Sequence, residues 1–252
     1  MKIATIRAPI YLPWLPFMWQ LANSDVYVVL DNTQFNRRET CAARNYIKLN
    51  DSKFCLSVPV KNTRIRGKRQ QFLDAIIDNT HNWAKKHFKT ICHAYSKAPF
   101  FKEYKEQLEH IYDKYGTGEQ RLVELDLELL NFLIREFGIN VKILKQSELG
   151  ANPGLKGAEL MVDICKKIDA DTYLCGGKEE TFLEEKILND NNIKVIYRDS
   201  YFKHPVYNQQ GKRFIKGLSS IDLLFNHGAE GSQNFLLSYK NNSEKLNRIL
   251  LD

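Results

Sequence analysis

Residues 24–35 read S-D-V-Y-V-V-L-D-N-T-Q-F, and residues 25–30 are a nearly continuous apolar run with several β-branched side chains. That pattern is typical of a strand covered on both faces, as in a parallel sheet. A second strand-like stretch, residues 2–7, precedes it and ends before Pro9. The segment 8–24 between them is long enough for a loop and a short helix. We therefore expect the strand, crossover and strand that open a doubly wound sheet.

The stretch that follows predicts a hairpin. Residues 45–49 and 53–60 are strand-like and flank the turn sequence Asn50-Asp51-Ser52. A basic loop over residues 61–71 leads to another short strand near residues 72–77.

Helical periodicity dominates the middle of the chain. Apolar side chains spaced by four predict a helix from residue 83 to 95, and a second helix follows to about residue 115. Leucine and phenylalanine spacing predicts a third helix over residues 122–137. Strands and helices then alternate again, with strands expected at 141–144, 171–174 and 194–197 and helices around 161–168 and 179–189.

These elements predict an α/β fold: a doubly wound, mostly parallel sheet with a β-hairpin insertion and a helical cap. Residues 1–80 would form the first half of the core with the basic hairpin, 81–138 the helical cap, and 139–252 the second half with the C-terminal helices. A chain of 252 residues can hold these parts in one compact unit. The Asn- and Lys-rich tail from Lys240 is expected to fray.

The composition, 43% hydrophobic and 27% charged, is that of a globular protein. No apolar run approaches the ~20 residues that cross a bilayer, and the first residues do not have the pattern of a signal peptide. Five cysteines without a C-x-x-C pair indicate reduced thiols. We expect a cytoplasmic protein with no membrane span, no metal site and no permanently bound cofactor.

The positive charge is concentrated in one stretch. Residues 32–69 contain ten basic and two acidic side chains, a net charge of +8, whereas the remaining 27 basic and 28 acidic side chains give −1. Such a concentration favours an anionic partner: phosphate groups, nucleic acid or a membrane surface. A solvated, lysine-rich surface is the alternative.

Polar and aromatic side chains follow the first two predicted strands. The segment P-I-Y-L-P-W-L-P (9–16) places Tyr11 and Trp14 between rigid prolines, which would form a preshaped wall for a sugar-like ligand. Asp31 and Gln34 follow the second strand and could hold ribose or sugar hydroxyls. The carboxyl ends of strands in open α/β sheets are where ligands bind. A packed crossover loop and an Asp31 turn cap are the structural alternatives.

The predicted hairpin carries Arg44, Asn45 and Lys48. Residues 44 and 48 lie on the same face of a strand, so two cations could hold a diphosphate there. A solvated hairpin face is again the alternative.

Two further segments carry candidate groups. His87 lies on the apolar stripe of its helix, where it is either a core histidine or a group that faces a cleft. Cys175-Gly176-Gly177 ends a strand and precedes a helix, so the glycine amides could bind an anion. Cys175 is a weak candidate for a nucleophile, because no histidine is close to it in the sequence.

The last cluster contains Tyr207, Gln209, Ser219 and Asp222. These side chains are expected to contact the substrate. Ser219 is also a good helix N-cap, and Asp222 could complete a capping box with it. The helix would end at Gly228.

The order and spacing of these motifs resemble the WbqC-like family of bacterial proteins. The resemblance extends from about residue 3 to residue 228 and rests on P-I-Y-L-P-W-L (9–15), S-D-V-Y-V-V-L-D-N-T-Q-F (24–35), R-N-Y-I-K (44–48), L-S-V-P-V (56–60), A-P-F-F (98–101), Y-L-C-G-G (173–177) and L-S-S-I-D-L-L-F-N-H-G (218–228). It implies a role in the biosynthesis of lipopolysaccharide O-antigen and other surface polysaccharides. Members of the family accompany enzymes that make amino-deoxysugars. The resemblance also implies a transferase that acylates the sugar amine with glycine or another small amino acid.

The chain departs from the family pattern at two places. Arg7-Ala8 stands where His-Gln is common, which removes a histidine from that strand end. Cys175 stands where serine is common, which argues against an obligatory cysteine nucleophile.

The function expected from the sequence is thus amide formation on a nucleotide-linked amino-deoxysugar. His87 or Asp31 would be the base, and the Gly176-Gly177 amides would stabilise the oxyanion. The acyl donor is left open between a thioester on a carrier protein, an adenylate and an aminoacyl-tRNA. The alternatives are a nucleic-acid-binding module that uses residues 37–69, and a non-catalytic scaffold of a polysaccharide assembly complex. Nucleic acid in general is not expected, because aromatic residues do not interleave with the basic ones between 61 and 71.

Overall fold

The computed structural model describes residues 1–36, 41–61, 70–152, 154–176 and 183–240, with side chains to residue 236. Its centre is a five-stranded sheet with the order β5-β2-β1-β6-β7. Every neighbouring pair of strands in this sheet is parallel, as predicted for a doubly wound fold. The strands are β1 (Ile3–Arg7), β2 (Val26–Val29), β5 (Lys142–Lys145), β6 (Thr172–Cys175) and β7 (Lys194–Tyr197).

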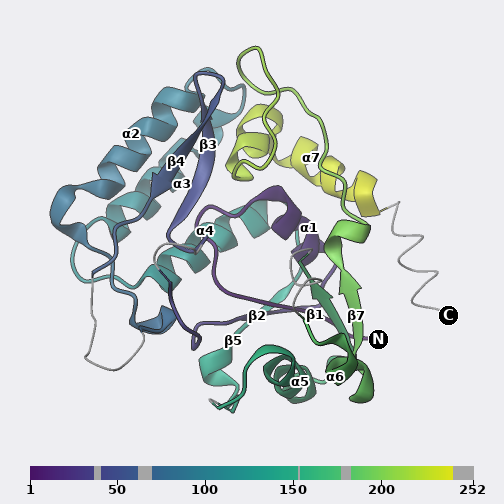
Figure 1. Ribbon diagram of the computed structural model, residues 1–252. Coiled ribbons are helices and arrows are strands. Elements are labelled where there is room, and N and C mark those ends of the chain that lie inside the picture. Colours follow the sequence, from purple (N-terminus) through teal and green to yellow (C-terminus); the bar gives the residue numbers. More distant parts are fainter. Residues whose placement is uncertain (37–40, 62–69, 153, 177–182, 241–252) are drawn as a thin grey trace.

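Helices cover both faces of this sheet because side chains alternate along each strand. On β2, Val26 and Val28 pack against the layer that contains α5 (Gly157–Lys167) and α6 (Glu185–Asp190). Tyr27 points to the opposite face, where its ring meets Phe17 of α1 (Leu15–Ala22) edge-on at 5.2 Å. The sheet therefore lies between two helical layers (Figure 1).

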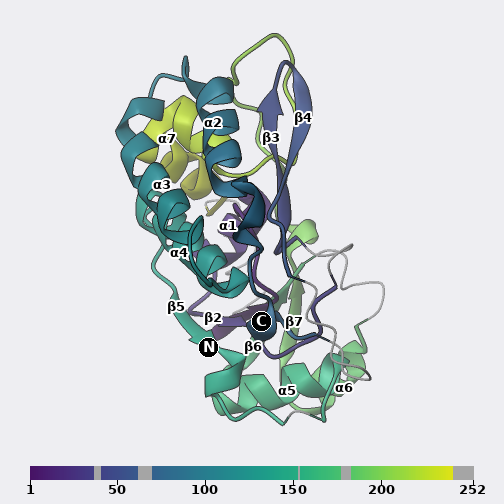
Figure 2. The same cartoon turned by 90° about the vertical axis from the view of Figure 1, so that its left-hand side faces the viewer.

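The layer on the α1 side is the larger one. It includes the helices expected as a cap, and their apolar faces form one continuous core with α1 and the sheet. Figures 1 and 2 show this layer on the side of the sheet away from α5 and α6. Its helices are α2 (Trp83–Tyr95), α3 (Phe101–Tyr115), α4 (Leu122–Glu136) and α7 (Ile221–Lys240).

The predicted hairpin is present as a separate antiparallel pair, β3 (Arg44–Leu49) and β4 (Ser52–Ser57). Asn50 and Asp51 form its two-residue turn, and both have positive φ, 49° and 55°. This is the conformation of a type I′ turn, which fits the twist of the two strands. The hairpin stands beside α2 (Figures 1 and 2).

Two local predictions need correction. The strand expected near residues 72–77 is instead the 3-10 turn η1 (Phe72–Asp74), since the amides of Asp74 and Ala75 bond back to the carbonyls three residues earlier. Gly228 has the expected positive φ of 69°, but it forms a kink within α7 and does not end the helix.

Other expectations fall partly outside the described residues. The helix predicted over 179–189 is described only as α6, because residues 177–182 are not described. The tail beyond Lys240 is likewise outside the described part of the chain. Among the described helices, none is both long enough and apolar enough to pass through a bilayer.

Candidate functional site at the carboxyl edge of the sheet

The order of the strands defines where a ligand would bind. The chain runs from β1 to β2 on one side and returns to β6 on the other, so β1 and β6 form the switch point of the sheet. In open α/β sheets the crevice at such a point, outside the carboxyl ends of the strands, is the usual ligand site. The residues that follow β1, β2, β5, β6 and β7 are therefore the candidates for contact with a ligand.

Asp31 lies just beyond the end of β2 and is buried. Its carboxylate accepts two hydrogen bonds from Ser147, at 2.9 Å from the backbone amide and 2.6 Å from the hydroxyl. The parallel register of β2 and β5 explains this contact. Val29 lies opposite Lys145, and Asp31 and Ser147 each follow two residues later. Asp31 is thus a rigidly oriented acceptor at the sheet edge.

Next to this pair is a buried acceptor that has no partner within the described structure. The side-chain oxygen Oε1 of Gln146, the residue directly after β5, accepts no hydrogen bond from any described residue. Leaving a buried polar atom unpaired costs about 1–3 kcal/mol, so such atoms in native proteins commonly mark a place where a ligand or water binds. The edge therefore holds, just beneath its surface, a fixed carboxylate and an amide oxygen without a described partner.

Trp14 lines the same edge from the loop after β1. Its indole Nε1 is buried and donates to no acceptor in the described residues. The guanidinium of Arg198, which follows β7, stands over the indole ring at 5.8 Å from the ring centre. Arg198 is itself buried and bonded to Asp199 and Gln20. A cation stacked on an aromatic ring is a pairing suited to sugars and phosphates.

The glycines and Gln34 occupy two further positions. Gly176 follows β6 directly and is buried, whereas Gly177 lies outside the described residues. Gln34 is exposed and forms an antiparallel bridge with Gln71, so it lies at the rim of the edge.

Tyr11 and His87 are brought together, but inside the core. The Tyr11 hydroxyl shares hydrogen bonds with His87 Nδ1 at 2.8 Å and with the Tyr112 hydroxyl at 2.5 Å. The ring of Trp83 packs edge-on against the imidazole. Burial lowers the pKa of His87 to about 4, so its imidazole is neutral at pH 7. In this position His87 fixes the loop after β1 to α2.

Asn45, predicted to bind substrate, also holds that loop. Its amide nitrogen donates to the carbonyls of Tyr11 at 3.1 Å and Leu12 at 2.8 Å, while its oxygen accepts from the Tyr46 amide at 2.8 Å. Leu12 is fully buried and has a φ of 44°, a conformation that is strained for a residue with a branched side chain. The Asn45 contacts help to keep the loop in this strained shape.

Arg44 and Lys48 lie at opposite ends of β3, about 13 Å apart along the strand. Lys48 is only 5% exposed. Its ammonium donates to the carbonyl of Arg213 and forms an ion pair with Asp51 at 3.1 Å. The two cations are therefore not adjacent, and the Lys48 ammonium is already bonded within the protein.

The C-terminal cluster centres on Asp222, which is completely buried. Its two carboxylate oxygens accept hydrogen bonds from the hydroxyls of Tyr95 and Tyr207, each at 2.9 Å. Burial raises the pKa of Asp222 above its ordinary range. Since both oxygens are engaged in this way, Asp222 does not form the capping box that the sequence allowed.

Ser219 and Gln209 support the same region. The Ser219 hydroxyl accepts from the Ile221 amide at 3.4 Å, as an N-cap does, and Ser219 bridges to Trp14. Gln209 closes its own loop through two bonds with the backbone of Ile215.

A second buried carboxyl, Asp126 of α4, was not singled out from the sequence. Neither of its oxygens has a hydrogen-bond partner among the described residues. Burial raises its pKa well above the ordinary value; burial also raises the pKa values of Tyr11 and Tyr27, with a smaller contribution from Asp126. Asp126 therefore lies near the aromatic residues beneath the loop after β1.

The structure thus separates the predicted residues into three groups. Asp31, Trp14 and Gly176 lie at the carboxyl edge, Tyr11, Asn45 and His87 anchor its loop, and Lys48, Tyr207 and Asp222 form a polar core under the hairpin. Gln146, Ser147 and Arg198 were missed. Each follows the end of a predicted strand, so the edge rule applied to every strand would have found them.

All five cysteines are free, and Cys165 and Cys175 are buried. Within the described residues, no three His, Cys, Asp or Glu side chains are grouped so that they could hold a metal ion.

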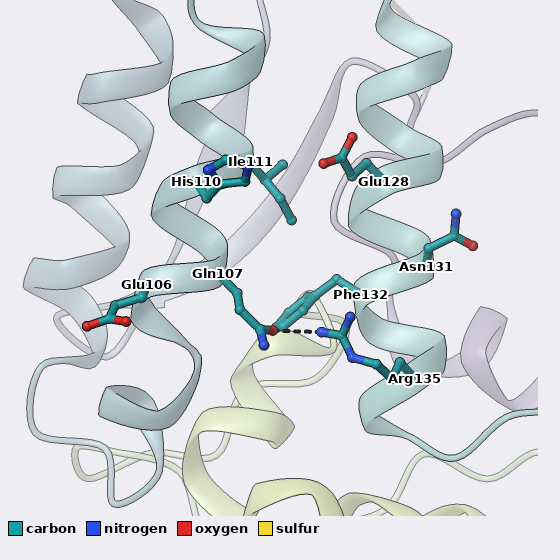
Figure 3. Close-up of a pocket in the computed structure, with 8 residues that line it drawn as sticks. All are labelled: Glu106, Gln107, His110, Ile111, Glu128, Asn131, Phe132 and Arg135. Atoms are coloured by element: carbon teal, nitrogen blue, oxygen red, sulfur yellow. Dashed lines mark hydrogen bonds between the residues drawn. The ribbon is translucent and has the colours of Figure 1, made fainter.

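The largest described cavity away from the edge lies between α3 and α4 and has a volume of about 460 Å³ (Figure 3). Its floor contains Phe132, and Arg135 donates to Gln107 across it at 2.7 Å. It includes none of the predicted site residues, and we assign it no role in the site.

The fold and this edge define a doubly wound α/β protein with buried polar side chains at the carboxyl edge of its sheet. Comparison with known proteins then places it more narrowly. The chain belongs to the WbqC-like protein family, whose model matches residues 8–234. It is also similar to an uncharacterized protein of Mycobacterium tuberculosis, Rv1507c, with 28% identity over 230 residues that cover 91% of this chain and 95% of the relative. No solved structure matches the sequence.

Proposed function

We propose that the protein is a cytoplasmic transferase that acylates the amine of a nucleotide-linked amino-deoxysugar, in the biosynthesis of O-antigen or another surface polysaccharide. The acyl group would be glycine or another small amino acid. Membership of the WbqC-like family supports the pathway, and the carboxyl edge of the sheet supports the location of the site. No permanently bound cofactor is needed for this reaction, but an activated acyl donor is.

The observation that carries the proposal is the acceptor group at the ends of β2 and β5. An ammonium donates three hydrogen bonds and has no acceptor of its own. Asp31 offers a carboxylate held in place by Ser147, and Gln146 offers an amide oxygen without a partner in the described structure. Such a set of acceptors suits the amine of the sugar.

Trp14 and Arg198 suit the rest of the donor molecule. The indole ring is partly exposed at the edge and could contact a sugar ring, whereas its unpaired N–H donor is buried beneath that surface. Arg198 supplies a positive charge beside it, close to where a phosphate of the nucleotide would lie.

In this site Asp31 would act as the base. The bound ammonium first loses one proton to solvent, and the neutral nitrogen then attacks the acyl carbon, the new C–N bond forms, and the bond from that carbon to the leaving group breaks. The nitrogen becomes more acidic as the bond forms, so its second proton can pass to the Asp31 carboxylate and from there to the leaving group. The amide of Gly176, which directly follows β6, would donate to the developing oxyanion.

His87 is the weaker candidate for the base. Its imidazole is buried among Trp83, Tyr11 and Tyr112, and its pKa of about 4 makes it a poor proton acceptor. Its contacts favour a role in positioning the loop after β1.

The test is to incubate the purified protein with nucleotide-linked amino-deoxysugars and with glycine presented as a thioester, an adenylate or an aminoacyl-tRNA. Mass spectrometry would detect the amide product. We expect Asp31→Asn to lower its rate of formation by ~10²–10⁴-fold, the range for loss of a catalytic base. Gln146→Leu should chiefly raise the KM for the amino sugar, because it removes only an acceptor.

The matched control is Asp113→Asn, which makes the same change at an exposed position of α3. It should leave the rate unchanged. No product from any donor with any amino sugar, or an equal loss in the Asp31 and Asp113 variants, would contradict the proposal.

A further inference from the structure

Two segments that are far apart in the sequence form one surface at the tip of the hairpin. The backbone amides of Lys212 and Arg213 donate to the carboxylate of Asp51 in the hairpin turn, at 3.0 and 3.3 Å. The Lys48 ammonium reaches from β3 to the carbonyl of Arg213. In Figures 1 and 2 the loop before α7 runs beside the tip of β3 and β4. We call residues 44–57 and 203–217 together the hairpin–loop surface.

Most of the net charge of the chain belongs to this surface. Its residues include seven basic and one acidic side chain, 7 − 1 = +6, against +7 for the whole chain. The one acidic side chain, Asp51, is paired with Lys48. Five of the cations are exposed, and within the described parts of the chain none of them forms an ion pair: Lys53, Lys203, Lys212, Arg213 and Lys216. Exposed cations without counterions favour a polyanionic partner.

An exposed ring accompanies these cations. Among the described residues only four large hydrophobic side chains are exposed, and three belong to these two segments: Tyr46 at 40%, Phe54 at 42% and Val206 at 72%. Phe54 pairs with Ile47, so it points to the opposite face of the hairpin, whereas Tyr46 shares its face with Lys53. The Lys53 ammonium lies 5.8 Å from the centre of the Tyr46 ring. Aromatic rings among cations are the pattern that binds single-stranded nucleic acid, because bases stack on the rings while the cations hold the phosphates.

We propose that the hairpin–loop surface binds single-stranded RNA, and that this RNA is the 3′ end that carries the activated acyl group as an ester. The second part rests on the proposed function. The basic segment 61–71 lacks interleaved aromatic residues, but the hairpin–loop surface supplies them from a different part of the fold. A membrane would need a larger apolar area than these three separate side chains, and an acidic protein would not need exposed rings.

The hairpin is joined to the candidate site. The carbonyl of Tyr46 accepts from the Ser219 amide at 2.8 Å, and Ser219 bridges to Trp14 at the carboxyl edge. An RNA bound at the hairpin would extend its 3′ end to this edge, where the sugar amine would bind. There the nitrogen attacks the ester carbonyl, the C–O bond to the ribose breaks, and the amine proton ends on the ribose oxygen.

The first experiment measures binding alone. A fluorescein-labelled 12-nucleotide RNA that ends in CCA is titrated with the full-length protein at several salt concentrations. We expect Lys53→Ala/Lys216→Ala to weaken binding and to reduce the salt slope by about 1.4, since each phosphate contact on a single strand contributes about 0.7. Tyr46→Ala should weaken binding by about 5- to 50-fold, whereas Tyr46→Phe, which keeps the ring, should bind like the wild type.

The matched control is Lys102→Ala/Lys105→Ala, which removes two exposed cations from α3. It should bind the RNA as the wild type does, and circular dichroism should show that every variant is folded. The proposal is overturned if the RNA does not bind at low salt, if both double variants lose affinity equally, or if polyglutamate or phosphatidylglycerol vesicles bind as tightly as the RNA.

The second experiment separates this proposal from the proposed function. Asp31→Asn should abolish amide formation and leave RNA binding intact. RNA binding by the hairpin–loop surface without any amide product would contradict the transferase, whereas product from a thioester or an adenylate but not from the RNA ester would overturn the role of the RNA.

Discussion

Replacement of Asn45 by alanine tests how the loop after β1 is held. The change removes three hydrogen bonds, two from the side-chain nitrogen to the carbonyls of Tyr11 and Leu12 and one to the Tyr46 amide. At about 1 kcal/mol for each bond, the free energy of unfolding should fall by about 3 kcal/mol. For a chain of this length, 1 kcal/mol corresponds to about 2–4 °C, so Tm should fall by about 6–12 °C. Leu12 would also lose a contact that supports its strained conformation.

Differential scanning calorimetry and urea unfolding would measure this change, with Asn23→Ala as the matched control. Asn23 makes a single side-chain hydrogen bond, to the Trp19 carbonyl four residues earlier, so its loss should cost about 1 kcal/mol. Asn45→Asp should be at least as destabilising as the alanine variant, because a carboxylate cannot donate to two carbonyl oxygens. A fall in Tm no larger than that of Asn23→Ala would refute the idea that Asn45 anchors the loop.

Three further predictions concern buried groups. Burial lowers the pKa of His87 from about 6.5 to about 4, so near pH 5 only the unfolded chain binds a proton at this imidazole. The free energy of unfolding of the wild type should therefore fall by about 2 kcal/mol between pH 7 and pH 5. Urea unfolding of His87→Gln should not show this fall. Burial raises the pKa of Asp126, so the stability of the wild type falls as pH rises above about 4, where the carboxyl of the unfolded chain ionises. The stability of Asp126→Asn relative to the wild type should therefore increase from pH 5 to pH 8. A difference in stability that stays the same over this range would contradict the prediction. Cys175→Ser keeps a donor for the Ile196 carbonyl, so it should retain most of the proposed activity, and complete loss with a trapped thioester would show that the thiol takes part.

The sheet was predictable because its signals are local. The apolar runs at residues 2–7 and 25–30 became β1 and β2, and the change to a spacing of four marked α2 at residue 83. Residues 72–77 were wrongly predicted as a strand. Phe72, Ala75 and Ile77 are buried, and such an intermittent apolar pattern is compatible with a strand as well as with the turn that forms there. Most of the other backbone hydrogen bonds of this segment go to distant parts of the chain, such as those from the Phe72 and Leu73 amides to Thr33 and Asp31, so its conformation depends on the tertiary structure.

The site was predictable only in part. Asp31 was found because it directly follows a strand, but its partner Ser147 comes 116 residues later and is specified by the parallel register of β2 and β5. Lys48 was expected to face a ligand. Its actual partner, the carbonyl of Arg213, belongs to a loop whose position no local pattern indicates. Contacts of this kind depend on the tertiary structure.

The position of β1 has a consequence for how the chain folds. β1 is the central strand, yet one of its two neighbours, β6, begins only at Thr172, about two-thirds of the way along the chain. During synthesis β1 can pair with β2 early. The other edge of β1 stays unpaired until about 170 residues have been synthesised. Long-range parallel pairing of this kind folds slowly and leaves an open strand edge in the intermediate. Ribosome-bound chains that end before β6 should therefore be the ones that associate with chaperones.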